Sequence, residues 1–425
     1  MTITIFSAVL LGAMTLGMPI AFALLVTALA LMWHLDAFDT QLVGLQMING
    51  ADSFPLLAVP FFLLAGEAMN AGGLSRRLVD FGLSLIGHVK GGLGYVAIVT
   101  AILLASLSGS AVADTAAVAS ILIPVMRKTG YELGRSGGLI ASAGVIAPVL
   151  PPSIGYIVFG VAGSVSVTRL FLAGIVPGIL MGIALGLTWW FVTRLDKLET
   201  LPRQTWRQRG RALVDASLAL VMPVIIIGGL KAGIFTPTEA AVVAAVYAIA
   251  VGMFVYGELK VSQLYGIFLA AVRTTSAVMF LVATAAVSAY LIAIANIPAE
   301  VNNLLAPFHG NKVMLMAAIM VLVVVVGTAL DFIPTILILT PVLMPIVKGA
   351  GIDPVYFGVL FIMNNAIGLI TPPVGTVLNV VCAIARIDMG QVMRGVMPFL
   401  IAELIVLALL TVFPQLVMVP ARWFY

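Results

Sequence analysis

The sequence predicts an all-helical membrane protein that crosses the bilayer many times. Of its 425 residues, 62% are hydrophobic and only 9% are charged, and the mean hydropathy is +1.20. A water-soluble core does not absorb that much apolar surface. Apolar stretches of about 20 residues, the length that spans hydrocarbon, recur along the chain. They lie at 2–33, 170–192, 213–230, 240–256 and 398–419.

The first of these stretches predicts a single helix that is not removed as a signal peptide. Its start lacks basic residues and its apolar run is longer than that of a signal sequence. A second local pattern predicts a helix lying along the membrane surface, because apolar residues at helical spacing adjoin two arginines. These residues are Leu74, Leu78, Phe81 and Leu85, with Arg76 and Arg77. Thr236, Pro237 and Glu239 have the spacing of a helix capping box.

The positive charges predict topology and not nucleic-acid binding. The formal net charge is +4, but the basic residues occupy short connections instead of one folded face. The connection with the most basic residues is 194–211, which contains Arg194, Lys197, Arg203, Arg207, Arg209 and Arg211. The positive-inside rule places it in the cytoplasm. The single cysteine, Cys382, excludes an internal disulfide.

Aspartate, proline and glycine residues in the first half of the chain recur in the second half at nearly constant offsets, which predicts two structural copies. Asp114 and Asp331 are 217 positions apart, as are Pro124 and Pro341. Farther along the offset becomes 221, shared by several glycines and by the chain's two Pro-Pro pairs, Pro151-Pro152 and Pro372-Pro373. The first copy is rich in basic residues and the second is not, as inverted copies require. The predicted divisions are 1–53 (N-terminal scaffold), 54–193 (first copy), 194–211 (basic loop), 212–271 (central scaffold) and 272–425 (second copy).

Each copy contains an apolar tract that we expect to turn back inside the membrane. In the first copy the halves 93–107 and 111–126 are about 23 Å long as helices, short of a bilayer of about 30 Å. Both outer ends are basic, so both face the same side. The predicted hairpin tips are Ser108, Gly109 and Ser110 in the first copy, and Gly327, Thr328 and Ala329 in the second.

Each copy also contains a helix that prolines are expected to break, at Pro151-Pro152-Ser153 and at 371–376. Irregular backbone inside a membrane is tolerated only where it is buried or lines a wet site. Its oxygen atoms suit a small hard cation such as Na⁺, and half-helix N-termini suit a substrate carboxylate. Two cation sites with a substrate between them are therefore predicted.

Asp114 and Asp331 each follow a hairpin tip, and two roles stay open for them. They either ligate a cation directly or support the residues that do, or they cap the start of a helix or orient the tip. Glu67 and Glu403 lie in apolar segments, where they are expected to contact another helix or a partner subunit. Because no base, nucleophile or metal cluster accompanies them, an enzyme is not expected.

Several segments together resemble one family, the large membrane subunit of tripartite ATP-independent periplasmic (TRAP) transporters, close to the permeases for sugar acids such as diketogulonate. They are LSGSAVADTAAVASILIP, PPSIGY, GIFTPTEAA, ILTPVLMP and GLITPPVGTVLNV. The resemblance covers essentially the whole chain. It implies a multi-pass protein of the bacterial inner membrane with the elevator fold of the ion-transporter superfamily. This fold has two inverted repeats, each with a re-entrant hairpin and a broken helix.

The resemblance also implies the function and the partners. The function is Na⁺-coupled uptake of a C4-dicarboxylate or sugar acid, with Na⁺ as coupling ion and no cofactor. The partners are a small four-helix membrane subunit and a periplasmic substrate-binding protein. A stand-alone divalent-anion/Na⁺ symporter of the same superfamily is the alternative, and a passive channel is a third possibility.

Carried onto this chain, the resemblance and the breaks assign the following residues. Cation site 1 comprises Ser108, Gly109, Ser110, Asp114, Pro148, Pro151 and Ser153. Cation site 2 comprises Gly327, Thr328, Asp331, Gly368, Thr371, Pro372, Gly375 and Thr376. The expected substrate contacts are Ser110, Ser153, Thr328 and Thr376.

Overall fold

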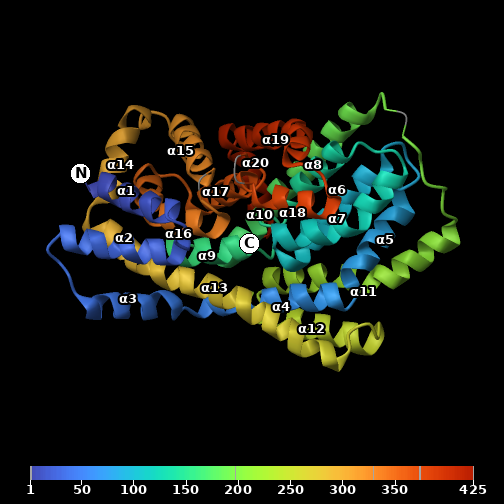
Figure 1. Cartoon of the computed structure of the whole chain (residues 1–425), viewed down its shortest axis with the longest axis horizontal. Helices are drawn as coiled ribbons and strands as arrows, with labels where there is room; N and C mark the ends of the chain where they lie inside the picture. Colours follow the sequence, from blue (N-terminus) through green and yellow to red (C-terminus); the bar gives the residue numbers. More distant parts are fainter. Residues whose placement is uncertain (1, 197, 329, 373–374, 425) are drawn as a thin grey trace.

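The computed structural model describes residues 2–196, 198–328, 330–372 and 375–424. All regular secondary structure in these ranges is helical, as the sequence predicts. Seven described helical segments are long and apolar enough to cross a membrane. The helices form a scaffold and two copies of a hairpin-containing unit (Figure 1). Ala329, part of the predicted second tip, and Pro373 and Val374, in the second break, lie outside the described residues.

The scaffold is built around the long helix α13, which packs against α2, α3 and α4, while α4 packs against α12. Figure 1 shows α13 running along the lower side of the molecule. The predicted boundary between residues 271 and 272 falls within this single helix. The scaffold elements are α1 (Thr2–Thr15), α2 (Ile20–His34), α3 (Thr40–Ala51), η1 (Phe54–Leu57), α4 (Ala58–Ala71), α11 (Trp206–Lys231), α12 (Pro237–Ala250), η2 (Val251–Val255) and α13 (Val261–Ile294).

The prediction of one helix over residues 2–33 is wrong. The chain forms α1 and α2, which pack against each other. Gly17 takes the left-handed conformation with φ +81°, and Pro19 is the N-cap of α2. Glycine adopts that φ without strain, and proline cannot continue the helix that precedes it. Hydropathy alone does not reveal the turn, because the residues on both sides of it are equally apolar.

The two copies have the same order of elements: a surface arm, a hairpin of two helices, a broken helix in two parts and a long helix. In the first copy these are α5 (Leu74–Ile86), α6 (Gly92–Ser108), α7 (Ala111–Lys128), α8 (Leu133–Gly144), α9 (Ile154–Gly163) and α10 (Val167–Thr193). In the second they are α14 (Ile297–Leu305), α15 (Lys312–Gly327), α16 (Phe332–Gly349), α17 (Pro354–Gly368), α18 (Thr376–Ala385) and α19 (Met389–Val412). The short η3 (Ala306–Phe308) follows α14, and α20 (Gln415–Phe424) ends the chain.

Both predicted hairpins form, and the copies exchange contacts. The hairpin helices α6 and α7 pack against each other, as do α15 and α16. The short helix α9 of the first copy packs on α16 of the second, and α18 of the second packs on α7 of the first. A ten-residue helix is only about 15 Å long, so α9 and α18 reach the interior and not the far side. This exchange brings both tips and both breaks toward one centre.

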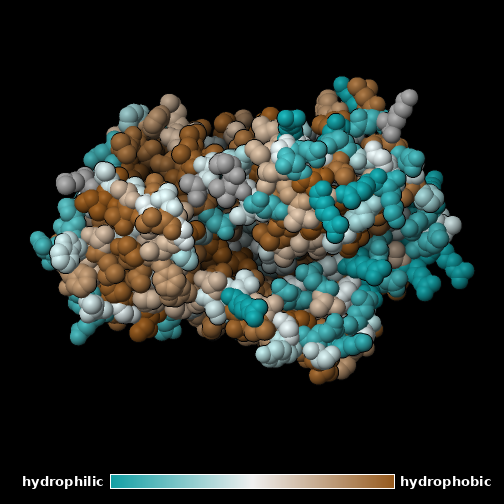
Figure 2. Space-filling model, in the orientation of Figure 1, coloured by the Kyte–Doolittle hydropathy of each residue, from teal (hydrophilic) through white to brown (hydrophobic). Residues whose placement is uncertain are grey.

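The surface reflects this layout. Figure 2 shows hydrophilic residues gathered at the right-hand end, over α5 and α11, and mostly apolar residues over the left-hand half. The arm α5 has the predicted two-sided character, since Leu74 and Leu78 are buried and Arg76 is exposed. The predicted capping box also forms: the Glu239 amide donates to the Thr236 hydroxyl at 3.3 Å, and the Thr236 amide donates to the Glu239 carboxylate at 2.8 Å.

Candidate cation and substrate site

The first hairpin tip is a tight turn pressed against the first break. Gly109 has φ +62°, and a Cβ at this position would collide with the carbonyl oxygen of Pro152. The Ser110 amide donates to the Ser108 hydroxyl at 3.1 Å. The Ser110 hydroxyl in turn accepts the Ala113 amide at 3.4 Å and so caps α7. The tip therefore needs glycine for two independent reasons, its φ and its closeness to the break.

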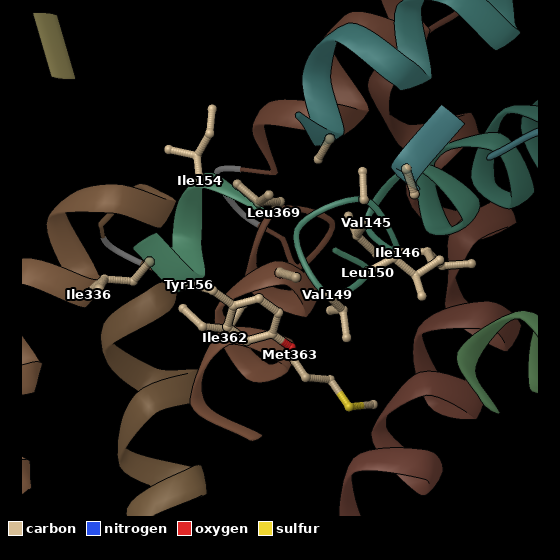
Figure 3. Packing of buried hydrophobic residues seen from close by; sticks show 14 of the residues in the cluster. Val145, Ile146, Val149, Leu150, Ile154, Tyr156, Ile336, Ile362, Met363 and Leu369 are labelled. Atoms are coloured by element: carbon tan, nitrogen blue, oxygen red, sulfur yellow. The ribbon is translucent and has the colours of Figure 1, made fainter. Parts of the chain in front are cut away.

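Hydrogen bonds of Ser153 fix the conformation of the first break, residues 145–153. The Ser153 hydroxyl donates to the carbonyl oxygen of Pro148 at 2.6 Å and accepts the Tyr156 amide at 3.4 Å. The side chain of Ser153 is fully buried. Figure 3 shows side chains of both breaks, with Val149 and Leu150 from the first and Leu369 from the second, in one apolar cluster. Pro151 and Pro152 have no amide proton, so each contributes a carbonyl acceptor to the break and no backbone donor.

Asp114 contacts the first hairpin tip and does not cap helix α7. It is 2% exposed, and its Oδ1 accepts the hydroxyl of Ser108 at 2.5 Å. Its Oδ2 has no hydrogen-bond partner among the described residues. The N-cap of α7 is Ser110 instead. Of the two roles that the sequence leaves open, the geometry is that of a residue that orients the tip, through Ser108.

Asp331 has different surroundings, although it corresponds to Asp114 in sequence. It stands at the N-cap of α16, its side chain makes no capping hydrogen bond, and it is exposed. The reason is that α16 begins 221 positions after α7, whereas the aspartates are 217 apart. The second tip therefore stays non-helical for longer, and its aspartate falls in the turn instead of within the helix.

The second tip and the second break also meet. A Cβ at Gly368 would lie 3.5 Å from the carbonyl oxygen of Gly327. Between them is a cavity of about 10 Å³, which is room for one water-sized ion. Its lining residues are Gly327, Leu330, Asp331, Phe332, Asn365, Gly368, Leu369, Gly375 and Thr376.

Two side-chain oxygens at this small cavity are buried and have no partner among the described residues. They are Oδ1 of Asn365 and Oγ1 of Thr376. The sequence prediction missed Asn365, although the Asn-Asn pair in the apolar run 355–367 is a signal that could have identified it. Thr328, Thr371 and Pro372 do not line this cavity. The hydroxyls of Thr328 and Thr371 donate instead to the carbonyl oxygens of Val325 and Ile367, in the last turns of the preceding helices α15 and α17.

A larger cavity of about 730 Å³ joins the two halves of the site. Both tips and both breaks line it, and the scaffold contributes α2, α4 and α13. Of the four predicted substrate contacts, Ser110 and Thr376 line this cavity, and Ser153 and Thr328 do not. The remaining predicted site residues that line it are Ser108, Gly109, Pro148 and Asp331.

The electrostatics of the larger cavity are distinctive. Its lining includes the first residues of four helices, α7, α9, α16 and α18, whose free amides carry partial positive charge. It includes two carboxylates, Glu67 and Asp331, and no lysine or arginine. An organic anion bound here would be balanced by helix termini and cations and not by a basic side chain.

The other acidic residue singled out in the sequence lies elsewhere. Glu403 in α19 is fully buried, and neither of its carboxyl oxygens has a hydrogen-bond partner among the described residues. Of the two contacts expected for Glu403, its burial fits a contact with another helix and not one with a partner subunit, because no part of the residue reaches the surface.

A family model described as "Tripartite ATP-independent periplasmic transporter, DctM component" matches residues 7–416. The chain belongs to this family. The relatives of this DctM-type permease include the 2,3-diketo-L-gulonate TRAP transporter large permease protein of Escherichia coli, which is 52% identical over the whole of both chains. The sialic acid TRAP transporter large permease protein of Vibrio cholerae is 39% identical over 95% of each chain. Such relatives are permeases and not enzymes.

The fold of this TRAP permease has a counterpart among solved structures. The YdaH transporter of Alcanivorax borkumensis superposes with a TM-score of 0.55, covering 88% of this chain and 86% of that one, at 18% identity. At that identity the likeness concerns the fold alone. The predicted all-helical, multi-pass fold class is confirmed, and it contains both predicted hairpins and both broken helices.

Proposed function

We propose that this permease carries out Na⁺-coupled uptake of a small molecule bearing a carboxylate, a C4-dicarboxylate or a sugar acid, across the bacterial inner membrane. The substrate arrives from a periplasmic binding protein, and a small four-helix membrane subunit extends the scaffold. The 52% identity to a diketogulonate permease favours a sugar acid as substrate.

One observation carries the proposal: the central cavity has four helix N-termini and no basic side chain. Helix N-termini bind anions through free amides and the helix dipole. They supply only about half a charge each, whereas Glu67 and Asp331 add negative charge to the cavity. Cations that enter with the substrate complete the balance. The unpartnered oxygens beside the second tip are suitable ligands for one of them.

In this proposal the two sites act as one unit. A cation at each tip would draw hairpin and break together, and the substrate would bind only when both are in place. The unit formed by hairpins and broken helices then moves against the scaffold, because the arms α5 and α14 lie between the two groups. Coupling follows if the empty or half-loaded unit moves less readily than the fully loaded one.

The test uses Thr376→Val in proteoliposomes that also contain the partner proteins. Thr376 lines both cavities and its hydroxyl has no hydrogen-bond partner among the described residues, so valine removes an oxygen atom and little else. We expect the Na⁺ concentration for half-maximal uptake to rise about tenfold, equivalent to about 1.4 kcal/mol. Thr340→Val is the matched control, because its buried hydroxyl donates to Ile336 within α16. An unchanged Na⁺ dependence in Thr376→Val would refute the second cation site.

A further inference from the structure

A third cavity shares no lining residue with the two cavities of the candidate site. It has a volume of about 610 Å³ and is enclosed by the arm α5, the first turns of α11 and the end of η2. Its charged lining residues are three arginines and three carboxylates: Arg76, Arg77, Arg211, Asp80, Asp215 and Glu258. The walls therefore carry both signs of charge in equal number, which is unlike a simple anion site.

The frame of this cavity is held by specific contacts. Arg77 pairs with Glu258 at 2.7 Å, and its guanidinium lies 3.7 Å from the ring centroid of Tyr256. The Tyr256 hydroxyl donates to the backbone carbonyl of Asp215 at 2.8 Å. Arg77 also donates to the carbonyl oxygen of Gly73 at 2.9 Å. These contacts join the arm, the end of η2 and α11, so the cavity is formed before any ligand binds.

The remaining four charges are available to a ligand. Arg76 and Asp80 approach only to 4.0 Å, with side chains 76% and 57% exposed, which is a weak pair. Arg211 and Asp215 are one turn apart on α11 and both are exposed. Two arginines and two carboxylates therefore face the cavity without strong partners of their own.

Exposed apolar residues line the cavity or adjoin its lining residues in sequence. Val255, which lines it, is 61% exposed, and Phe254 and Val214, next in sequence to Val255 and Asp215, are 82% and 70% exposed. The lining residues of α11 belong to a helix that is long and apolar enough to span a membrane. A charged recess that opens directly onto exposed apolar residues at the end of membrane-spanning helices matches a phospholipid, with its headgroup inside and its acyl chains along α11.

We propose that this cavity binds the headgroup of phosphatidylethanolamine. Its phosphate would contact Arg76 and Arg211, and its ammonium, with three N–H donors, would contact Asp80 and Asp215. An anionic phosphatidylglycerol offers nothing to the carboxylates. The quaternary ammonium of phosphatidylcholine has no N–H donor, and the one aromatic ring in the lining already carries Arg77. The bound lipid would fasten the arm α5 to the scaffold.

The test is lipid retention by the purified permease, measured by native mass spectrometry after exposure to the three lipids with identical acyl chains. We expect phosphatidylethanolamine to be retained about tenfold more than phosphatidylcholine or phosphatidylglycerol. Arg76→Gln with Arg211→Gln should abolish this preference. Arg203→Gln with Arg207→Gln, which removes the same charge from outside the cavity, should keep it.

A second variant keeps the proposal testable if the first one folds poorly. Asp80→Asn with Asp215→Asn removes the partners of the ammonium only, and it should shift the preference toward phosphatidylglycerol. Equal retention of all three lipids by the unaltered chain would overturn the proposal. So would a wild-type preference for phosphatidylglycerol, or displacement of the lipid by the small membrane subunit with Arg76 and Arg211 at the protein contact.

Discussion

At the scale of single residues, the proposed sites depend on short polar side chains that have few alternative partners. Ser110 and Ser153 are each tied to backbone groups, and they shape the first tip and break. Asn365 and Thr376 leave their oxygens free beside the second. The first site therefore offers backbone oxygens and the unpartnered Oδ2 of Asp114, and the second offers the neutral oxygens of Asn365 and Thr376. Side-chain substitutions are therefore expected to affect both proposed cation sites.

Asn365→Ala should raise the Na⁺ concentration for half-maximal uptake about tenfold, because it removes an unpartnered oxygen from a cavity with room for one ion. Asn364→Ala is the matched control. Each of the two amides donates to a backbone carbonyl and leaves its own Oδ1 unpartnered, but Asn364 does not line the cavity. The control should lower thermal stability and leave the Na⁺ dependence unchanged. Equal Na⁺ dependence in both variants would exclude Asn365 as a ligand.

Asp114 is expected to act through Ser108, and two substitutions separate charge from geometry. Asn keeps an acceptor for the Ser108 hydroxyl, whereas Ala removes it. We expect Asp114→Asn to change the half-maximal Na⁺ concentration by a few-fold at most and Asp114→Ala by more than tenfold, in Na⁺ titrations of uptake. Comparable large losses in both would mean that the negative charge itself holds the cation.

At the scale of elements, the hairpin and the break form one contact in each copy, and glycine allows it. Ser108 and Ser110 flank a residue whose φ is left-handed and whose missing side chain leaves room for the Pro152 carbonyl. In the second copy the approach is looser, since a Cβ at Gly368 would still be 3.5 Å from Gly327. The two copies are therefore alike in topology and unlike in packing at the tips.

Gly109→Ala is expected to reduce transport strongly, because it combines backbone strain of about 1 kcal/mol with a collision against Pro152. Gly327→Ala is the control at the corresponding tip, where nothing lies within 4 Å of an added Cβ and φ is not positive. Its uptake should stay within a few-fold of the unaltered permease. The measurement is initial uptake rate at saturating Na⁺, normalised to folded protein. Equal rates for the two variants would contradict the packing seen at the first tip.

At the scale of the whole molecule, the scaffold lines one side of the central cavity and both copies line the other. In the proposed function this arrangement couples ions, substrate and movement. If two Na⁺ enter with a monoanion, one net positive charge moves inward in each cycle. An inside-negative potential of 100 mV then adds about 2.3 kcal/mol to the driving force. We expect accumulation to rise with imposed potential at fixed Na⁺ gradient, measured in proteoliposomes with a potassium diffusion potential. A voltage-independent rate and extent would contradict this stoichiometry.

The partner requirement is testable at the same scale. Proteoliposomes that lack the periplasmic binding protein should show no uptake, since the central cavity has no basic residue to attract a free organic anion. Uptake by the permease and small subunit alone would support the stand-alone symporter instead. Uptake that never exceeds equilibrium under a Na⁺ gradient would indicate a channel.

The sequence by itself determined the helical membrane class, the duplication, both hairpins and both breaks, because hydropathy and the positions of glycine and proline act locally. It also located the tip of the first hairpin to the residue. It did not separate α1 from α2, since apolar residues flank the turn on both sides, and it did not reveal that α13 runs through the expected domain boundary.

Only the tertiary structure decided which of these features meet. The exchange of α9 and α18 between copies brings four helix N-termini to one cavity, and no local pattern encodes that exchange. Because α16 starts later than its counterpart α7, Asp331 lies in the turn, whereas Asp114 lies within the helix. The packing of α17 near the second tip makes Asn365 a lining residue of the small, ion-sized cavity. These outcomes depend on contacts between residues hundreds of positions apart, which packing selects and periodicity does not record.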